Sequence, residues 1–435
     1  MFVHVSAAAE GGIPVTINIP PPVADILSRL EACGFAAYAV GGCVRDSLLG
    51  NAPQDWDICT SAEPAEISVC FSDCRILETG LRHGTVTVMT GGVPYEITTF
   101  RVEGAYSDRR RPDSVVFVKS LREDLARRDF TVNAMAARRD GTVLDPFGGR
   151  ADLRSRLVRC VGQPEARFGE DALRILRAIR FSAVLDFEIE TGTAAAIHEN
   201  LGLLSALAAE LITAELMKTL TGQGIRRVLI DFFDVFGAVL PCLAGVLGKG
   251  ESARKTWGNK ADAIACAARD PAIRLALLLQ GDDAVTALRR LRLDRMMAAR
   301  VENMLLWQQE IPEEAGEIRR LICRLGPDCF FDILTHKKAE CVPRGSVAAA
   351  NRLAALARVE QYAREALAGG NCLSLRQLAL NGREILSLGV PEGPRVGALL
   401  TALLDGVLEG RLPNERDVLL AEARRMIAGG AFSKL

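Results

Sequence analysis

The segment that decides the fold reads Gly41-Gly42-Cys43-Val44-Arg45-Asp46, and Asp55-Trp56-Asp57 follows it. Glycines that end a strand let backbone N–H groups approach a phosphate closely, and Arg45 can add charge-assisted hydrogen bonds to a triphosphate. If Asp55 and Asp57 alternate along a strand, both project from one face, where paired carboxylates can hold Mg²⁺. Each motif alone is compatible with a plain turn or a solvated strand end. Together they predict a metal-dependent site for a nucleoside triphosphate.

Strand and helix patterns alternate around this segment. Phe35–Val40 and Asp55–Thr60 are β-rich, and Thr85–Thr90 and Val93–Arg101 flank Gly91-Gly92, a two-residue hairpin signal. Beyond about residue 150 the chain is rich in Ala, Leu and Arg, with helical periodicity broken by Gly and Pro. We therefore predict an N-terminal extension (1–21) and an α+β head (22–150), followed by an all-α neck (151–225), body (226–320) and tail (321–435).

Composition narrows the class of protein. The 53 basic and 54 acidic residues nearly cancel, so any basic surface for a nucleic acid must be local. The twelve cysteines form no CxxC pair, and the four histidines (His4, His83, His198 and His336) lie at no zinc spacing. The chain shows neither a signal peptide nor an apolar run of about 18 residues. We expect a cytoplasmic protein with reduced cysteines, no zinc and no membrane span.

Three further segments extend the pattern: Arg127-Arg128-Asp129-Phe130-Thr131-Val132-Asn133-Ala134, Asp145-Pro146-Phe147-Gly148-Gly149, and Glu170-Asp171 through Arg180-Phe181. With the glycine and DxD motifs they resemble the class II tRNA nucleotidyltransferases and bacterial poly(A) polymerases, relatives of DNA polymerase beta. The resemblance covers about residues 36–187. It implies a polymerase-beta-like nucleotidyltransferase head and a neck helix that reads the incoming base.

The resemblance also implies roles for individual residues. Asp55 and Asp57 would be catalytic and would hold Mg²⁺, and Glu96 is a candidate third carboxylate, with a surface glutamate as the alternative. Arg177 and Arg180 would reach the triphosphate or the primer end, with an ordinary salt-bridged helix face as the alternative. The full nucleotide-binding set is Gly41, Gly42, Arg45, Arg128, Asn133, Asp171, Arg174, Arg177 and Arg180.

Asp171 and Arg174 explain how a protein could select a base without a template. At a spacing of three they would be neighbours on one helix face. Asp offers only acceptors and Arg only donors. Cytosine and adenine present an amino donor beside a ring acceptor, which fits this pair, whereas guanine and uracil present the reverse order. The pair should therefore accept CTP and ATP and reject GTP and UTP.

Four activities remain open within the resemblance: CCA, CC-only, A-only and poly(A) addition. Ile76–Val88 resembles the CCA-type stretch, and Arg101–Val118 is a polar insertion like the loop that CCA-adding enzymes need to change from CTP to ATP. A disordered basic surface loop is the alternative for the insertion. We therefore expect CCA addition to tRNA from CTP and ATP.

The helical remainder offers weaker signals for the tRNA partner, whose acceptor stem and elbow we expect the enzyme to contact. Asn381–Leu386 and Gly393–Gly397 resemble a tail module that holds the tRNA elbow, and a loop between packed helices is the alternative. An arginine cluster offers a phosphate track or a solvated helix face. The cluster comprises Arg289, Arg290, Arg292, Arg295 and Arg300. Leu211 stands where the family usually has arginine.

Overall fold

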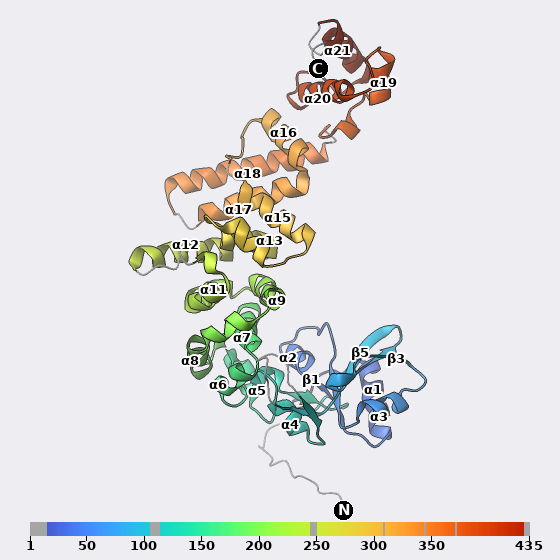
Figure 1. Cartoon of the computed structure of the whole chain (residues 1–435), viewed down its shortest axis with the longest axis vertical. Helices are drawn as coiled ribbons and strands as arrows, with labels where there is room; N and C mark the ends of the chain where they lie inside the picture. Colours follow the sequence, from blue (N-terminus) through green and yellow to red (C-terminus); the bar gives the residue numbers. More distant parts are fainter. Residues whose placement is uncertain are drawn as a thin grey trace, which may run out of the picture. The chain divides into compact units, whose positions relative to one another are not determined.

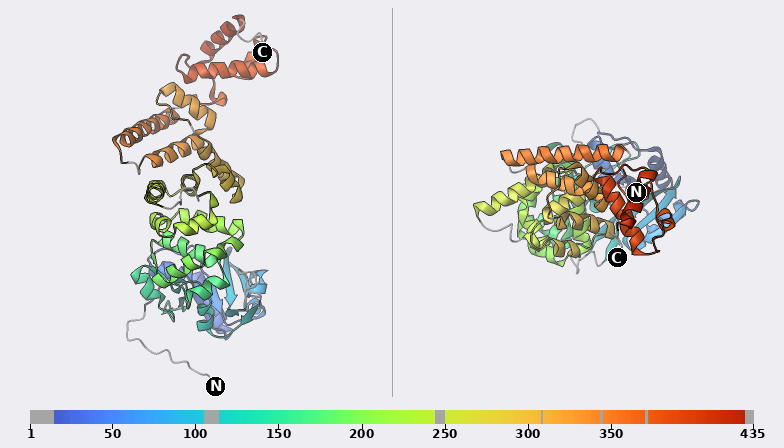
Figure 2. Two further views of the ribbon diagram at one scale, coloured as in Figure 1. Left: turned by 60° about the vertical axis from the view of Figure 1, so that its left-hand side comes forward. Right: turned by 90° about the horizontal axis from the view of Figure 1, so that it is seen from above.

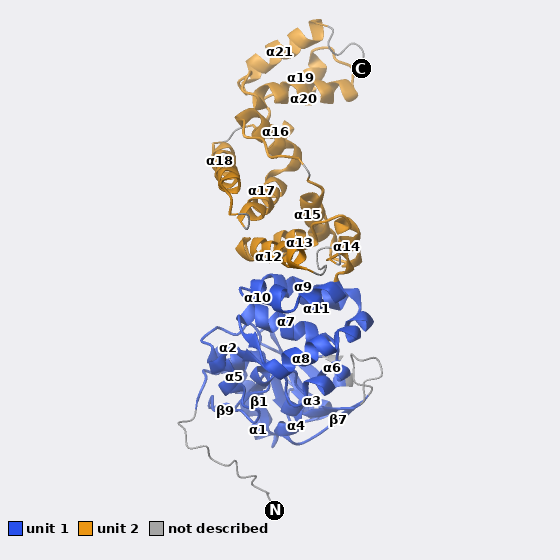
Figure 3. Cartoon of the chain, turned by 90° about the vertical axis from the view of Figure 1, so that its left-hand side faces the viewer, with its two compact units in different colours: residues 1–239 blue, residues 240–435 orange. Residues whose placement is uncertain are grey.

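The computed structural model describes residues 15–104, 114–243, 250–307, 309–342, 345–369 and 372–429 of the 435-residue chain. The chain divides into two compact units, residues 1–239 (unit 1) and 240–435 (unit 2) (Figure 3). All strands of the described residues lie in unit 1, and unit 2 is built from helices. This confirms the predicted fold class, an α+β head followed by a helical region.

One mixed sheet of seven strands organises unit 1 (Figure 1). Gly91 and Gly92 have φ of 59° and 81°, angles that glycine adopts without strain. They form the predicted tight turn between the strands Thr85–Thr90 and Val93–Thr99. Within this sheet every neighbouring pair of strands is antiparallel except Ile58–Thr60 with Val93–Thr99, which run parallel. In spatial order the strands are β3 (Arg75–Gly80), β4 (Thr85–Thr90), β5 (Val93–Thr99), β2 (Ile58–Thr60), β1 (Ala37–Val40), β8 (Ala136–Ala137) and β9 (Val143–Leu144).

Three predicted strand boundaries were wrong. β1 begins at Ala37 because the N–H of Phe35 still bonds the carbonyl of Leu30 at the end of the preceding helix (3.0 Å). β2 begins at Ile58, so Asp55 and Asp57 precede the strand. Beyond Thr99 the chain leaves the sheet and forms a separate two-stranded ladder, β6 (Arg101–Glu103) with β7 (Val115–Phe117). This ladder carries the predicted insertion, whose residues Tyr106, Asp108, Arg109, Arg110, Arg111 and Pro112 lie outside the described residues.

The helices of unit 1 begin and pack as their sequences dictate. α1 starts with proline at its first positions and buries Val23, Ile26, Leu27 and Leu30, one helical stripe, against β1. α7 runs along α9 and also contacts α10. The helices are α1 (Pro21–Ala32), α2 (Gly42–Leu48), α3 (Pro64–Cys70), α4 (Leu121–Ala126), α5 (Gly149–Ser155), α6 (Pro164–Glu170), α7 (Leu173–Leu185), α8 (Thr191–Glu199), α9 (Ala209–Leu220), α10 (Ile225–Asp231) and α11 (Phe233–Val239).

A buried apolar cluster positions the motifs. Val40, Phe100, Leu125 and Ala136 pack together, joining β1, α4 and β8. Val40 directly precedes the glycine pair, and Leu125 lies two residues before Arg127. The same cluster therefore fixes the backbone from which both motifs extend.

The chain near its N-terminus adds to the sheet. The N–H of Ile17 bonds the carbonyl of Gly141 (3.0 Å), and the N–H of Val143 bonds the carbonyl of Val15 (3.0 Å). Thr16 and Thr142 form an antiparallel bridge. Residues 15–17 thus lie beside β9, the last strand of the sheet.

Unit 2 consists of packed helices. α13 (Pro271–Leu279) is buried on nearly all sides, and its N-cap is Asp270, whose carboxylate accepts from the N–H of Ala272 (2.8 Å). α18 lies beside α17 (Figure 2). None of the helices that the structure describes is long and apolar enough to cross a membrane. The helices are α12 (Glu251–Cys266), α13 (Pro271–Leu279), α14 (Ala284–Arg290), α15 (Arg295–Leu306), α16 (Ala315–Leu325), α17 (Pro327–Cys341), α18 (Val347–Ala368), α19 (Gly382–Ser387), α20 (Pro394–Leu408) and α21 (Arg416–Ala428).

Candidate active site

Gly41 lets two predicted nucleotide-binding residues approach the turn that opens α2. Its φ is +83°, and a Cβ placed there would lie 3.0 Å from Nη1 of Arg128 and 3.8 Å from the carbonyl oxygen of Asn133. A side chain at this position would strain the backbone and displace Arg128. The glycine therefore brings the strand end and the Arg128 segment together. Gly42 lies beside Arg45, and a Cβ placed there would be 3.7 Å from Nη2 of Arg45, an ordinary contact distance.

A chain of polar contacts continues from Arg45. Its Nη1 donates to Oδ1 of Asn133 (2.7 Å), and Nδ2 of Asn133 donates to Oδ1 of Asp129 (3.1 Å). The other oxygen of Asp129 accepts from Nε and Nη2 of Arg177 (2.8 and 2.6 Å). Burial alone would raise the pKa of Asp129, but the charge and hydrogen bonds of Arg177 hold that pKa below its ordinary value. The structure thus connects the predicted nucleotide-binding residue Asn133 directly to Arg45 and, through Asp129, to Arg177.

The two aspartates of the DxD motif lie just before β2. The carbonyl of Asp57 accepts from the N–H of Val40 (2.9 Å), so this residue extends the contact between β2 and β1. The side chains of Asp55 and Asp57 are both exposed. The surrounding protein raises the pKa of Asp57, the nearby charge of Asp55 adds to the rise, and Arg128 opposes it. Two carboxylates that repel each other at the surface fit a site for a hard cation such as Mg²⁺.

Glu96 lies level with Asp57 on the neighbouring strand. β2 and β5 run parallel with Ile58 opposite Ile97, so the residues before each occupy the same level of the sheet. Glu96 is exposed. Within the described part of the chain, no three His, Cys, Asp or Glu side chains converge in a way that could hold a metal ion. The structure therefore does not draw Glu96 into a cluster with Asp55 and Asp57.

A cavity of about 250 Å³ opens between the Arg128 segment and the start of α7. Its volume is below the roughly 300–1,000 Å³ of sites for drug-sized ligands, so it matches part of a nucleotide. Four predicted nucleotide-binding residues line it, and Arg45, Arg180 and the DxD aspartates do not. The lining residues are Glu103, Arg127, Arg128, Asp129, Asp171, Leu173, Arg174 and Arg177.

Asp171 and Arg174 do not share one continuous helix, which corrects the sequence prediction. α6 ends at Glu170, Asp171 has extended backbone angles, and α7 begins at Leu173. The Asp171 carboxylate accepts from the N–H of Leu173 (3.0 Å), and short polar side chains commonly interrupt helices in this way. Both side chains nevertheless line the same cavity.

Arg174 is held by neighbours that the sequence reasoning missed. Its Nη1 donates to Oε2 of Glu170 (2.8 Å), and its Nη2 donates to the carbonyl of Arg127 (3.1 Å). Glu103 lies 3.8 Å from Nη2 of Arg174 and accepts from Nη1 of Arg127 (2.9 Å). Glu170 could have been found as the acidic residue that precedes Asp171. Glu103 had no local signal, because only the fold brings β6 to α7.

Asp124 contacts both Arg127 and Arg128. It is fully buried, and its oxygens lie 2.8 Å from Nη2 of Arg127 and 3.5 Å from Nη2 of Arg128. The spacings of three and four residues are the ones at which helical neighbours meet, so this contact was available from the sequence. Arg180 has a comparable partner in Glu215, whose Oε2 accepts from its Nε at 2.5 Å.

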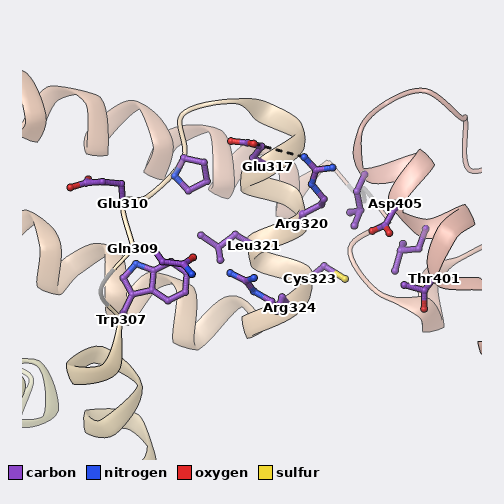
Figure 4. A pocket seen from close by; sticks show the side chains of 13 residues that line it. Trp307, Gln309, Glu310, Glu317, Arg320, Leu321, Cys323, Arg324, Thr401 and Asp405 are labelled. Atoms are coloured by element: carbon purple, nitrogen blue, oxygen red, sulfur yellow. Dashed lines mark ion pairs between the residues drawn. The ribbon is translucent and has the colours of Figure 1, made fainter. Parts of the chain in front are cut away.

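Unit 2 contains a separate cavity of about 560 Å³ between α16 and α20 (Figure 4). The guanidinium of Arg324 lies over the Trp307 ring, 5.7 Å from its centroid, and Arg320 pairs with Glu317 and Glu409. The cavity thus combines an aromatic face with charges of both signs.

In unit 2, residues from two segments that the sequence analysis considered for tRNA binding have partners within the protein. Arg300, from the arginine cluster, forms ion pairs with Asp270 (2.7 Å) and Asp332 (2.5 Å), so its charge is already offset within the protein. In the tail, the side chain of Asn381 caps α19 and accepts from the N–H groups of Arg383 and Glu384. Those N–H groups are therefore already satisfied within the protein.

Known proteins share both the sequence and the fold. Residues 37–159 match the poly A polymerase head domain family. The chain is 37% identical to a CCA-adding enzyme of Limosilactobacillus fermentum over 93% of this chain and 97% of the relative. It is 38% identical to a CCA-adding enzyme of Lacticaseibacillus paracasei over 92% and 95% of the two chains.

Solved structures agree. The Bacillus stearothermophilus CCA-adding enzyme in complex with CTP superposes with a TM-score of 0.76 at 32% identity, covering 95% of this chain and all of that one. The Thermotoga maritima CCA-adding enzyme complexed with tRNA has the same fold, with a TM-score of 0.60 at 21% identity over 94% and 96% of the two chains. On identity and coverage together, the chain belongs to the CCA-adding enzymes and is a nucleotidyltransferase.

Proposed function

We propose that this enzyme adds C, C and A without a template to the 3′ end of tRNA, using CTP and ATP and releasing pyrophosphate. The observation that carries the proposal is the cavity that holds Asp171, Arg174, Arg128 and Arg177 together. Arg128 also lies against Gly41 and influences the pKa of Asp57, so it connects the cavity to the DxD aspartates. A nucleotide whose base lies in the cavity would have its phosphates directed toward Asp55 and Asp57.

The base would be selected by Asp171 and Arg174. The carboxylate accepts from the amino group of cytosine or adenine, and the guanidinium donates to the adjacent ring nitrogen. Glu170 and the Arg127 carbonyl hold the guanidinium, which limits its reorientation toward the carbonyl group of uracil or guanine. UTP and GTP would then be rejected because their base edges would be mispaired and partly desolvated, which costs about 1–3 kcal/mol for each unsatisfied group.

Asp55 and Asp57 would hold Mg²⁺, which fits their oxygen ligands and their mutual repulsion. The bound ion supplies charge stabilisation at the reacting phosphate and eases deprotonation of the primer hydroxyl. Arg45, Arg177 and Arg180 would bind the triphosphate or the primer end, with Gly41 and Gly42 leaving room for the phosphates beside the backbone. Glu96 would have at most a supporting role. We place the enzyme in the cytoplasm, where its tRNA substrate and reduced thiols belong.

Unit 2 would contact the tRNA beyond its acceptor end. RNA bases stack on aromatic rings and on arginine planes, and the cavity around Trp307, Arg320 and Arg324 offers both. Because the N–H groups at Asn381 are already satisfied, we favour this cavity over the tail glycines as an RNA contact.

One assay separates the candidate activities. The purified enzyme is incubated with tRNA lacking its last three residues, with labelled CTP, labelled ATP or both, and the products are resolved at single-nucleotide length. CCA addition predicts +2 with CTP alone and +3 with both nucleotides. A CC-adding enzyme would stop at +2 with CTP alone and with both nucleotides, an A-adding enzyme would act only on tRNA ending in CC, and a poly(A) polymerase would make a long ladder from ATP alone.

The insertion gives a second test. Shortening residues 103–113 to a tight turn should spare C addition and impair the final A, if this segment serves the change from CTP to ATP. Glu103 must be kept in one version of the deletion, because it contacts Arg127. Equal loss of both steps in that version would refute a specific role in the change.

A further inference from the structure

Three of the arginines proposed to bind the nucleotide surround a single aromatic ring, that of Phe181. The guanidinium carbon of Arg180 lies 4.0 Å from the ring centroid, that of Arg45 5.2 Å, and that of Arg177 5.4 Å. Arg45 comes from α2, which follows the glycine pair, whereas Arg177, Arg180 and Phe181 belong to α7. The ring therefore joins the two elements that supply cations to the site.

The ring itself is fixed. Phe181 is only 6% exposed, and its ring meets that of Phe130 edge-on, with centroids 5.7 Å apart and planes at 79°. Phe130 directly follows Asp129, the partner of Arg177. Edge-to-face contact is a preferred geometry for aromatic pairs, so the position of Phe181 is set by packing and does not depend on the arginines.

Three guanidinium groups this close together repel one another, so each needs a partner. Carboxylates are poor partners beside a triphosphate, because both are negatively charged. Arg45 pairs with Asp46 (2.8 Å), Arg177 with Asp129 (2.6 Å) and Arg180 with Glu215 (2.5 Å). Each carboxylate holds its arginine but offsets its charge and repels phosphate. Burial lowers the pKa of Arg180, Glu215 opposes this change, and repulsion from Arg177 adds to it, because the cations lie close together.

An aromatic face attracts a guanidinium through its quadrupole and carries no net charge. We propose that Phe181 is a positioning residue for nucleotide binding: its ring holds Arg45, Arg177 and Arg180 at the spacing a nucleoside triphosphate requires, without offsetting their charge. The inference rests on the proposed function, because it assumes that these arginines contact the triphosphate. It assigns Phe181 a role that acts through the three arginines around its ring.

The test weakens the quadrupole while keeping the shape of the ring. We would replace Phe181 with 3,4,5-trifluorophenylalanine in the full-length enzyme and compare it with Phe181→Leu, which removes the ring. Phe236→Leu is the matched control for loss of a buried ring, since Phe236 is 2% exposed, lies on α11 of the same unit, and has no guanidinium over its ring among the described residues. Arg177→Met is the reference for loss of one cation.

We expect both Phe181 variants to raise the KM for CTP and ATP by roughly three- to tenfold, with little change in kcat or in tRNA affinity. The fluorinated enzyme should keep the wild-type melting temperature, and Phe236→Leu should lower that temperature without raising the nucleotide KM. If Arg177→Met raises the KM and the fluorinated ring does not, Phe181 is only a core residue and the inference is overturned while the proposed function stands. If Arg177→Met leaves the KM unchanged, the proposed arginine contacts and the inference fall together.

Discussion

The two units use their interiors differently. In the described part of the chain, nearly all buried polar and charged side chains belong to unit 1, and unit 2 contributes only Arg274 and His336. Those of unit 1 include Asp129, Asp171 and Arg174, which line the site. Asp129 in unit 1 is bonded to Arg177 and Asn133, whereas both ring nitrogens of His336 are buried without a hydrogen-bond partner. Unit 1 thus uses its interior to fix charged groups, and unit 2 uses it for apolar helix packing. Polar substitutions should change chemistry in the first and stability in the second.

The largest expected effect lies at the DxD motif. Asp55→Asn and Asp57→Asn should each lower nucleotide addition by about 10³-fold or more, because several kcal/mol of transition-state stabilisation depend on a metal held by charged oxygens. Neither change should lower the melting temperature, since both side chains are exposed and repel each other. Single-turnover addition of CTP and thermal melting measure the two quantities. A variant that keeps more than a small percentage of turnover would contradict the assignment.

Substitution of Asp171 should change which base is accepted. Asp171→Asn retains an oxygen that can accept from the N–H of Leu173, so the junction of α6 and α7 should survive. It adds amide donors where an acceptor is needed, so CTP and ATP should lose roughly ten- to a hundredfold in rate while UTP and GTP gain relative to them. Single-turnover incorporation of all four nucleotides is the measurement. An unchanged ranking would mean that Asp171 only holds the turn between α6 and α7.

In unit 2, the buried His336 should make folding stability depend on pH. Burial lowers the pKa of this histidine from 6.5 to about 4, with the charges of Lys337 and Lys260 acting in the same direction and Glu340 opposing them. As the pH falls below 6.5 the unfolded chain takes up the proton first, so folding should lose about 2 kcal/mol by pH 5.

The pH effect can be isolated with His336→Leu, which should unfold with a weaker dependence on pH between 7 and 5. Melting followed across this range, with a probe on unit 2, gives the comparison. Nucleotide affinity at pH 7 should not change in this variant. A wild-type pH dependence that persists in His336→Leu would show that other groups control the acid stability of the unit.

The smallest effect is expected at Glu96. Because it is exposed and does not join a three-carboxylate group, Glu96→Gln should lower the rate by only a few-fold, with no change in base preference. The measurement is the rate of Glu96→Gln relative to that of Asp57→Asn at several Mg²⁺ concentrations. A loss as large as that of Asp57→Asn would make Glu96 a third metal ligand.

The sequence predicted the fold class and the hairpin because their signals are local. Gly91-Gly92 demands a tight turn, and the loss of alternating patterns after about residue 150 marks the helical remainder. Strand ends were less predictable, since the start of β1 depends on where the chain leaves α1. The break between Asp171 and Arg174 was missed because helical spacing was assumed through Asp171, which has extended backbone angles and bonds the N–H of Leu173.

The site could be predicted from the sequence only in part, because contacts between distant segments complete it. Glu103 approaches Arg174 only because β6 and α7 meet in space, and Glu215 reaches Arg180 from a separate helix, α9. The gathering of three arginines around Phe181 is of the same kind, because α2 and α7, which supply them, lie far apart in the sequence. Motifs name the charged residues, but the groups that hold them come from the packing.

Residues 15–17 have a consequence for handling the protein. By bonding to Gly141 and Val143 they cover the last strand of the sheet, whose N–H and C=O groups would otherwise face water. Uncovered edges of this kind are templates for pairing with another molecule. A shortened protein that starts at residue 18 should therefore keep its catalytic groups yet self-associate at high concentration, and its shelf life would depend on three residues remote from the chemistry.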